Sequence, residues 1–328
     1  MGAMHANSVC VILGTGGTIA GRATDPGDNV GYVAGEVGVN DLVQAVPPLK
    51  GLPIECEQVA QVDSKDMGFD VWKRLAERVA HHLAREEVTG VVVTHGTDTL
   101  EESAWFLQCL LDPRKPVVFT CAMRPSTALV PDGPQNLLDA VSVACSRGWG
   151  GVVLVAAGLV HRAEHVCKMH SYRVEAFDSG DAGPSACVEE GALRWFHLMP
   201  GPTVDEKRIL ERLALVKECG SLPGVAIVMS HAGADGRLVR GLLAMNQRGG
   251  GDHTRGIVVA CTGNGTIHVD LAAALQEAQG QGVKIVRSTR CARGRVVAHA
   301  GDLFEDSAGL SPVKARVALS LSLLPGWH

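Results

Sequence analysis

The chain has 328 residues, of which 46% are hydrophobic and 20% are charged, and its formal net charge is −5. This length allows two domains with a sizeable core. A nucleic-acid-binding protein needs a clustered basic face, and the Lys and Arg residues here are scattered through a net acidic chain. No run approaches the roughly 18 uninterrupted apolar residues of a membrane span. We therefore expect a globular protein that binds neither nucleic acid nor membranes.

Ten cysteines in a chain of this length are too dilute for a disulfide framework, and none forms a Cys-x-x-Cys pair. Residues 1–7 have neither the basic start nor the long apolar run of an export signal. Both features favour a reducing cytoplasm. A periplasmic location stays open, because a removed leader would leave no trace in the sequence.

Apolar runs typical of strands alternate with segments of helical period over the first two hundred residues. The segment 70–86 has apolar residues at four-residue spacing, which predicts an amphipathic helix. A second helix is expected over 98–111, where Asp98-x-x-Glu101 has the form of a capping box. This alternation indicates an α/β fold with a parallel sheet covered on both faces. Further elements are expected as strands at 9–13, 90–93, 116–120 and 151–155, and as a helix at 136–146.

Two stretches rich in Pro and Gly, at 200–202 and 220–224, bracket a charged helical segment, which indicates a linker. We therefore predict a catalytic domain over 1–200, a linker over 201–223 and a second α/β domain over 224–328. In the second domain, strands are expected at 225–228 and 256–260, and helices at 271–278 and 312–324.

Two threonine-bearing segments each follow an apolar strand run: Gly-Thr-Gly-Gly-Thr-Ile-Ala-Gly at 14–21 and Thr-His-Gly-Thr-Asp-Thr at 94–99. Ligands of open α/β sheets bind at the carboxyl ends of the strands. Glycines around Thr15 allow a close backbone approach, but a threonine hydroxyl becomes a nucleophile only with a base or a hydrogen-bond chain. By spacing alone, Thr15 or Thr18 can equally cap the next segment, and Asp98 can cap the helix after it.

Phosphate-binding patterns are incomplete in this chain. The Gly-x-Gly-x-x series starting at Gly14 ends on Ile19 where a dinucleotide fingerprint needs glycine, and no Gly-Lys-Ser/Thr ending exists. His161, Glu164 and His165 match the His-x-x-Glu-His pattern of some zinc hydrolases. Zinc needs two ligands on one helical face and a third nearby, and no helical apolar stripe surrounds this pattern. The alternative is a solvated loop with ordinary histidines.

Four further residues have an ordinary structural explanation when each is taken alone. His81 and His82 are helix neighbours that should point apart on the surface, and Lys168 has the character of a surface lysine. Tyr32 lies in a glycine-bounded stretch, which suits either a mobile lid or an aromatic side chain packed on the sheet edge.

Taken together, these segments resemble the bacterial-type L-asparaginases, a family of amidohydrolases with a threonine nucleophile. The resemblance extends over nearly the whole chain and rests above all on the two threonine segments at their observed separation. The segments that carry it are 14–21, 32–35, 63–67, 94–99, 122–127, 132–134, 263–265, 286–290 and 312–316.

The resemblance implies a mechanism. Thr15 would attack the side-chain amide carbon of asparagine to form a β-aspartyl enzyme, and Tyr32 would belong to the chain that activates Thr15. Thr97, Asp98 and Lys168 would form a second catalytic cluster around the scissile amide and the attacking water, with Asp98 also gripping the α-amino group. This is covalent catalysis supported by oriented polar groups.

The resemblance also implies a set of substrate contacts. Ser64 would hold the α-carboxylate, backbone groups near Gly96 and Ala122 would surround the substrate, and Thr266 would be contributed by a neighbouring subunit. Lys65, beside Ser64, would also belong to this substrate-binding set, and Lys65 and Thr266 depart from the family. Lys65 stands where relatives carry Gln or Glu and adds a positive charge that would repel the α-ammonium. Thr266 stands where relatives often have Asn or Ser, which bears on how well glutamine is accepted.

The family resemblance finally implies a fold and an assembly. We expect a larger N-terminal flavodoxin-like domain with a parallel sheet, a smaller C-terminal α/β domain and a homotetramer built as a dimer of dimers. No cofactor and no metal are expected. The substrate would be L-asparagine, with side activity on L-glutamine left open. The alternatives are an ammonia-supplying subunit of a tRNA-dependent amidotransferase and the zinc-dependent hydrolase of His161, Glu164 and His165.

Overall fold

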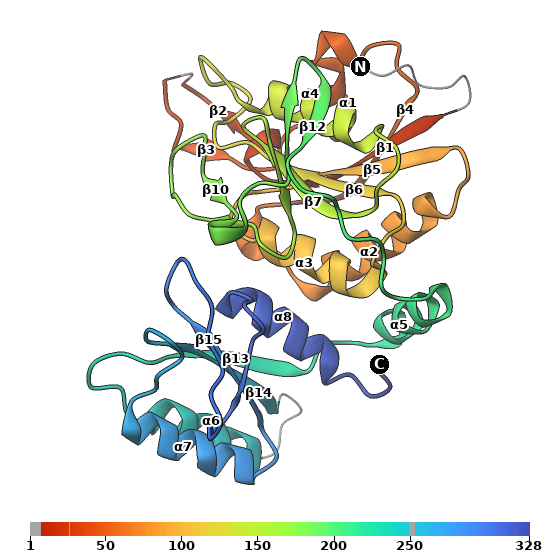
Figure 1. The fold of residues 1–328 in the computed structure, drawn as a ribbon. Helices are drawn as coiled ribbons and strands as arrows, with labels where there is room; N and C mark the ends of the chain where they lie inside the picture. Colours follow the sequence, from red (N-terminus) through yellow and green to blue (C-terminus); the bar gives the residue numbers. More distant parts are fainter. Residues whose placement is uncertain (1–7, 26, 249–252) are drawn as a thin grey trace. The chain divides into compact units, whose positions relative to one another are not determined.

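The structure is a computed structural model that describes residues 8–25, 27–248 and 253–328, so the segment 1–7 discussed above lies outside the described residues. The chain divides into two compact units, Met1–Lys217 and Glu218–His328, and the division falls within helix α5 (Glu206–Glu218). Each unit contains its own sheet and helices (Figure 1). Among the described residues, no helix combines the length and the apolar character needed to cross a bilayer.

The first unit is built on an eight-stranded sheet with the order β12-β11-β8-β7-β6-β5-β1-β4. Five of its strands are parallel: β1 (Val9–Gly16), β4 (Ile54–Val62), β5 (Val88–Thr94), β6 (Pro116–Thr120) and β7 (Gly151–Ala156). Three antiparallel strands that the sequence patterns did not predict extend one edge: β8 (Leu159–Arg162), β11 (Ala186–Glu189) and β12 (Ala192–Trp195). The predicted parallel α/β architecture is confirmed, with this antiparallel extension added.

The order of the parallel strands locates the binding edge. Numbered along the chain, the five strands lie in the order 2-1-3-4-5, the flavodoxin-like arrangement. The chain reverses direction across the sheet between β1 and β5, and sheets of this kind bind ligands at such a switch point, outside the carboxyl ends of the strands. Both threonine segments begin there, one at the end of β1 and the other at the end of β5.

Helices cover both faces of this sheet (Figure 1). On one face, α1 (Val39–Gln44) and α4 (Gly133–Ala144) pack on β1 residues such as Cys10 and Ile12. The helices α2 (Phe69–Leu83) and α3 (Leu100–Leu111) cover the other face, where Trp72 stacks on Phe106. The three predicted helices therefore exist, with ends displaced by a few residues.

The capping box predicted at Asp98 is not formed. Helix α3 begins one residue later than that box requires, with Thr99 at the N-cap and no side-chain cap. The carboxylate of Asp98 is engaged by Lys168 instead. A stronger charged partner from a distant segment therefore replaces the local cap.

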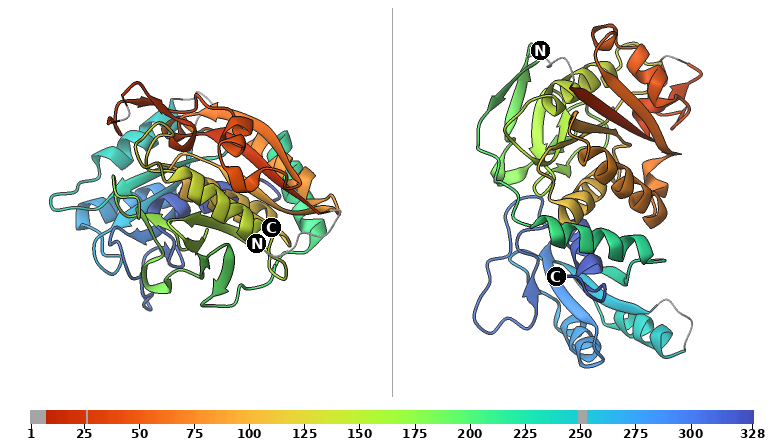
Figure 2. Two further views of the ribbon diagram at one scale, coloured as in Figure 1. Left: turned by 90° about the horizontal axis from the view of Figure 1, so that it is seen from above. Right: turned by 90° about the vertical axis from the view of Figure 1, so that its right-hand side faces the viewer.

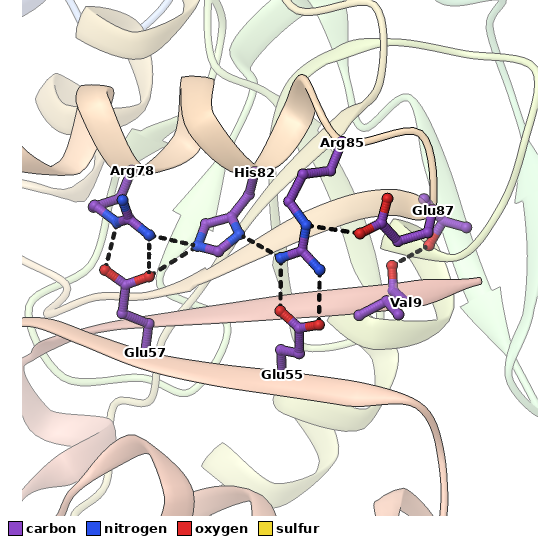
Figure 3. Close-up of polar contacts among 8 residues, drawn as sticks. Val9, Glu55, Glu57, Arg78, His82, Arg85 and Glu87 are labelled. Carbon is purple, nitrogen blue, oxygen red and sulfur yellow. Dashed lines mark hydrogen bonds and ion pairs between the residues drawn. The ribbon is translucent and has the colours of Figure 1, made fainter. Parts of the chain in front are cut away.

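The second histidine of the His81–His82 pair lies at the interface of α2 and β4, not on the surface (Figure 3). The Nε2 atom of His82 is 2.8 Å from Glu57, which also accepts two hydrogen bonds from Arg78. Its Nδ1 atom lies 3.1 Å from the guanidinium of Arg85, which also forms a two-pronged ion pair with Glu55. Because Arg85 can only donate, Nδ1 accepts and the ring proton is on Nε2, facing Glu57.

Short elements complete the first unit. They include two small antiparallel ribbons, of which the first carries Tyr32 and the second carries Lys168. These elements are β2 (Arg22–Ala23), β3 (Tyr32–Val33), β9 (Cys167–Lys168), β10 (Phe177–Asp178) and the 3-10 turns Thr18–Ala20, Pro47–Leu49, Ser64–Asp66 and Gly180–Ala182.

The second unit contains a four-stranded parallel sheet in the order β13-β14-β15-β16. Its strands are β13 (Gly224–Met229), β14 (Thr254–Cys261), β15 (Lys284–Thr289) and β16 (Glu305–Asp306). Helices α6 (Arg237–Gln247) and α7 (Val269–Gly280) lie side by side on one face, and α8 (Pro312–Ser322) packs on the other (Figures 1 and 2). The strands and helices predicted for this region are present, while α6, β15 and β16 were not predicted.

Candidate active site

Thr15 lies where β1 leaves its regular pairing. The ladder between β1 and β5 ends at the pair Gly14 and Thr94, and the register of β1 with β4 shifts between Gly14 and Gly16. Such a bulge turns a side chain out of the alternating pattern of a strand. The Thr15 side chain is 1% exposed, and its hydroxyl donates a hydrogen bond of 2.9 Å to the carbonyl of Thr94.

The two threonine loops meet through a pair of glycines. Gly17 has a φ of +81°, and a Cβ atom placed on it would lie 2.2 Å from the Cα atom of Gly96. A Cβ atom on Gly96 would in turn lie 2.5 Å from the hydroxyl oxygen of Ser64. Only glycine fits either position, so the two glycines allow the loops after β1 and β5 to approach backbone to backbone.

A charged cluster lies in the second loop. The ammonium of Lys168, on β9, donates to the Thr97 hydroxyl at 2.7 Å and to the Asp98 carboxylate at 2.5 Å. The side chain of Lys168 is 17% exposed and that of Asp98 is 56% exposed, so the lysine end of the pair is the more buried one. Glu101, in the first turn of α3, accepts a hydrogen bond of 3.2 Å from the Lys168 backbone N–H. The structure thus brings Lys168 to the adjacent residues Thr97 and Asp98, which lie 71 and 70 positions away in the chain.

Ser64 adjoins this cluster from the turn after β4. Its hydroxyl accepts a hydrogen bond of 3.2 Å from the Asp98 N–H, and its carbonyl accepts one of 2.7 Å from the Thr99 hydroxyl. Because the hydroxyl oxygen is the acceptor, its proton remains available to a ligand. The neighbouring Lys65 extends outward, with 61% of its side chain exposed, and pairs with Asp66 and, at 3.5 Å, with Asp63.

Tyr32, which the family resemblance implies in the chain that activates Thr15, contacts the neighbouring Thr18 in the structure. The Tyr32 hydroxyl lies 2.6 Å from the Thr18 hydroxyl, while the Thr15 hydroxyl is bonded to Thr94. The Tyr32 ring packs over Gly21, where an added Cβ atom would lie 2.7 Å from a ring carbon. Thr18 therefore links the segment of Tyr32 to the first loop, a role that the sequence patterns did not reveal.

His95 is a further residue of the site region for which no role was predicted. It is completely buried, and its Nδ1 atom lies 2.7 Å from the carbonyl of Gly96, so Nδ1 carries the proton. The other ring nitrogen has no hydrogen-bond partner among the described residues. Burial lowers the pKa of His95 to about 4, against the opposing effect of the Gly96 carbonyl. The imidazole is therefore neutral at neutral pH and supports the backbone beside Thr97.

The remaining two predicted positions lie in different units. Ala122 is buried in the loop that follows β6, in the first unit. Thr266 lies in the turn after β14, in the second unit, where its hydroxyl and backbone bond to Thr262.

The His-x-x-Glu-His segment does not lie on a helix. His161 belongs to strand β8, is 2% exposed and bonds through Nδ1 to the Ser179 hydroxyl at 2.9 Å. Burial lowers its pKa to about 4. Glu164 pairs with Arg162 at 2.7 Å and with His165 at 3.6 Å. The expectation that these histidines lie in a solvated loop is wrong for His161, and in the described part of the chain no group of three or more His, Cys, Asp or Glu residues could hold a metal ion.

Fold and site together define a two-unit α/β protein whose threonine-centred site lies at the switch point of a flavodoxin-like sheet. The family model described as "Asparaginase, N-terminal" matches residues 9–199, and the one described as "Glutaminase/Asparaginase C-terminal domain" matches residues 224–327. The chain belongs to the asparaginase family.

Similar proteins cover almost the whole chain. L-asparaginase 2 of Escherichia coli is 36% identical over 320 residues, which are 95% of this chain and 88% of that protein. The glutaminase-asparaginase of Pseudomonas fluorescens biotype A is 34% identical over 322 residues, 95% of this chain and 85% of that protein. The crystal structure of a probable cytoplasmic L-asparaginase from Campylobacter jejuni is similar with a TM-score of 0.87 and 35% identity, over 98% of this chain and 96% of that one.

Proposed function

We propose that this protein hydrolyses L-asparagine to L-aspartate and ammonia. Family membership and the names of the similar proteins support an asparaginase activity. The observation that carries the proposal is the buried Thr15 hydroxyl at a β-bulge, in a loop that touches the loop of the Thr97–Asp98–Lys168 cluster through Gly17 and Gly96. A positioned hydroxyl beside a lysine–carboxylate pair suits covalent hydrolysis of an amide.

In the proposed reaction, the Thr15 oxygen forms a bond to the side-chain carbonyl carbon of asparagine. The carbon–nitrogen bond then breaks, the nitrogen takes up a proton, and ammonia leaves a β-aspartyl ester on Thr15. Water adds to that ester, its carbon–oxygen bond to Thr15 breaks, and aspartate and the free hydroxyl are formed. Because the Thr15 proton is donated to Thr94 in the free protein, attack requires that this proton pass to a base.

Two groups can serve in that proton transfer. Tyr32 is held by Thr18, so its participation requires the lid to bring its hydroxyl toward Thr15. The cluster of Lys168, Thr97 and Asp98 is already assembled, and Thr97 directs its hydroxyl toward Asp98 at 3.4 Å. We propose that Thr97 and Lys168 handle the attacking water and that Tyr32 acts when the lid closes over the substrate.

The α-groups of the substrate would be bound by Ser64 and Asp98. Ser64 has a proton to donate to a carboxylate, and the half-exposed carboxylate of Asp98 offers an acceptor to an ammonium. Gly96 provides close backbone approach beside them. Lys65 stands in the same turn, but its charge is directed to Asp66 and Asp63, so we propose that its effect on the substrate is small.

Assembly and glutamine side activity are part of the proposal. We propose a homotetramer, a dimer of dimers, in which Thr266 of a neighbouring copy completes each site. Two of the similar proteins from Pseudomonas species are named glutaminase-asparaginases, which supports a side activity on L-glutamine. The Campylobacter protein is described as probable cytoplasmic and a Haemophilus influenzae relative as probable periplasmic. Of these two locations, the ten free cysteines favour the cytoplasm, where thiols stay reduced.

Replacing the proposed nucleophile tests the mechanism. Thr15→Ala should lower ammonia release from asparagine by at least about a thousandfold, because removal of a nucleophile removes the covalent step. The matched control is Thr18→Ala, which removes a neighbouring hydroxyl but leaves Thr15 in place, and it should retain much more activity. Light scattering and circular dichroism show whether each variant keeps its fold and assembly. Activity of Thr15→Ala near that of the unaltered protein would reject the assignment of the nucleophile.

A further inference from the structure

The last turn of α4 lies on β5 beside the start of β1. Cys10 of β1 pairs with Gly90 of β5. A Cβ atom placed on Gly90 would lie 2.4 Å from the carbonyl oxygen of Ala144, so only glycine leaves room for the helix backbone at this point. Cys145 follows Ala144 as the C-cap of α4. The missing side chain of Gly90 therefore allows the end of the helix that carries Cys145 to lie beside Cys10.

The thiols of Cys10 and Cys145 are in contact. Both cysteines are reduced, and a hydrogen bond joins their side chains. This bond and the complete burial of Cys10 hold the pKa of Cys10 well above its usual value. The pKa of Cys145 is lowered instead, first by the hydrogen bond with Cys10 and further by one with Thr89, against the opposing effect of burial. Because Cys145 is also partly exposed, it is the more reactive thiol of the two.

Contacts on both sides of the two thiols hold the segments together. Arg147, two residues after the helix cap, donates to the hydroxyl of Ser8 at 3.1 Å, just before β1 begins. Thr89, which precedes Gly90 in β5, donates to the Val9 carbonyl at 3.2 Å. The segments that carry the two thiols are therefore fixed by bonds that do not involve sulfur, so the pair is already assembled in the reduced protein.

We infer that Cys10 and Cys145 form a redox pair that a peroxide converts reversibly into a disulfide. The Cys145 sulfur attacks a peroxide oxygen, the O–O bond breaks, and Cys145 sulfenic acid and water are formed. The Cys10 sulfur then bonds to the Cys145 sulfur, while the sulfenic oxygen takes up the Cys10 proton and leaves as water. The two thiols thereby lose two electrons to the peroxide. A small-molecule thiol returns them by thiol–disulfide exchange, in which two of its molecules become a disulfide.

The pair is separate from the site of the proposed reaction. Cys10 lies at the start of β1 and Thr15 near its end, roughly 16 Å away at the rise of an extended strand. The inference therefore does not rest on the proposed function. In a reducing compartment such a disulfide is transient, which is typical of redox-sensing cysteines and not of structural ones.

Cys56 is the alternative partner for Cys10. It pairs with Ile12 in the ladder of β1 and β4, and side chains two positions apart on a strand share a face, so Cys56 and Cys10 project from the same side of the sheet. Burial raises the pKa of Cys56. Cys56 acts on Cys10 electrostatically, whereas Cys145 acts on it first through a hydrogen bond. The structure therefore favours Cys145 as the partner, and Cys56 is the matched control.

Peroxide treatment and peptide mass spectrometry test the inference. The full chain is reduced, freed of reductant and exposed to a small molar excess of hydrogen peroxide, and the remaining thiols are alkylated. We expect the tryptic peptide of Cys10 linked to that of Cys145, with the mass of two hydrogens lost, and its release by dithiothreitol. Fragment spectra must separate Cys145 from Cys121, because Arg124 precedes a proline and both cysteines stay in one tryptic peptide.

Two variants distinguish the pair from general oxidation. Cys10→Ser keeps a hydrogen-bond donor to Cys145 but cannot form the disulfide, so the Cys145 sulfenic acid should persist and be trapped by a cyclic 1,3-diketone. Cys56→Ser is the control, and it should form the link between Cys10 and Cys145 to the same extent as the unaltered protein. Circular dichroism shows whether each variant is folded.

A link between Cys10 and Cys145 in the unaltered protein and in Cys56→Ser, reversed by dithiothreitol, supports the inference. A link of Cys10 to Cys56 would overturn it. So would full alkylation of Cys10 and Cys145 after the peroxide has oxidised the exposed Cys291, or a folded Cys10→Ser variant that gives no trapped product. Each of these results leaves the proposed hydrolase standing, because ammonia release is not part of the test.

Discussion

At the scale of single residues, the charge of Lys65 shows why the place of a side chain matters more than its type. A lysine beside Ser64 predicts repulsion of the substrate ammonium. In the structure, its own neighbours Asp66 and Asp63 hold the ammonium, and Asp66, followed by Asp63, raises the pKa of Lys65. The group is largely exposed, so water and salt screen its field.

We therefore expect Lys65→Gln to change KM for asparagine by less than about twofold, because exposed pairs of this kind contribute little. Steady-state kinetics at low and moderate ionic strength measure this. Lys168→Gln is the contrast, since it removes the donor to Thr97 and should lower kcat strongly. A several-fold drop in KM for Lys65→Gln at low salt would mean that its charge reaches the substrate.

At the scale of elements, the site depends on how closely two loops approach each other. Gly17 combines a positive φ with a near contact to Gly96, whereas Gly148 has a similar φ of +88° and nothing within 4 Å of an added Cβ atom. Substitutions of Gly17 and Gly148 therefore differ in loop contact but share the backbone strain of a positive φ.

Gly148→Ala should cost about 1 kcal/mol, the strain of a left-handed alanine. Gly17→Ala should lower the free energy of unfolding by at least about 2 kcal/mol, because the loop after β1 must move away from the loop after β5. It should also abolish most of the activity. Urea unfolding and ammonia release measure the two effects. Equal stability and activity in the two variants would contradict the importance of the contact.

Local patterns in the sequence were sufficient for elements whose burial repeats with a fixed period. They predicted α2, α3, six of the parallel strands (β1, β5, β6, β7, β13 and β14) and the position of Thr15 at a strand end, because these depend on nearby residues. Partners from distant segments could not be predicted. The capping role of Asp98 failed because Lys168 binds it, and the surface positions assigned to His82 and His161 failed because β4 and Ser179 cover them. The bond between Tyr32 and Thr18 likewise depends on how the segment between them turns back as the ribbon of β2 and β3.

At the scale of the whole molecule, buried neutral histidines couple stability to pH. Burial lowers the pKa values of His95 and His161 from the ordinary value of 6.5 to about 4. Between these values the unfolded chain binds more protons than the folded one, so stability decreases as the pH falls. As the pH falls below the ordinary glutamate pKa of 4.5, the carboxylates of Glu55 and Glu57 add to the loss, since hydrogen bonds from Arg85 and Arg78 lower their pKa values in the folded state.

We expect the free energy of unfolding to fall by a few kcal/mol between pH 6.5 and pH 4, with at most roughly 3 kcal/mol from each of the two histidines. Denaturant unfolding at a series of pH values measures this slope. His161→Gln should flatten the slope because it removes one titrating group, whatever its effect on stability at neutral pH. A stability that stays constant down to pH 4.5 would contradict the assignment of both buried rings.

The open sheet of the first unit ends on β4 and β12, whose outer backbone groups have no ladder partner among the described residues. Unpaired edge strands of this kind can pair with strands of other molecules and extend the sheet. Here β4 carries Glu55 and Glu57 tied to arginines, and β12 carries Arg194 tied to Glu189. Charged side chains along both borders oppose such growth and disfavour lateral templating into fibrils.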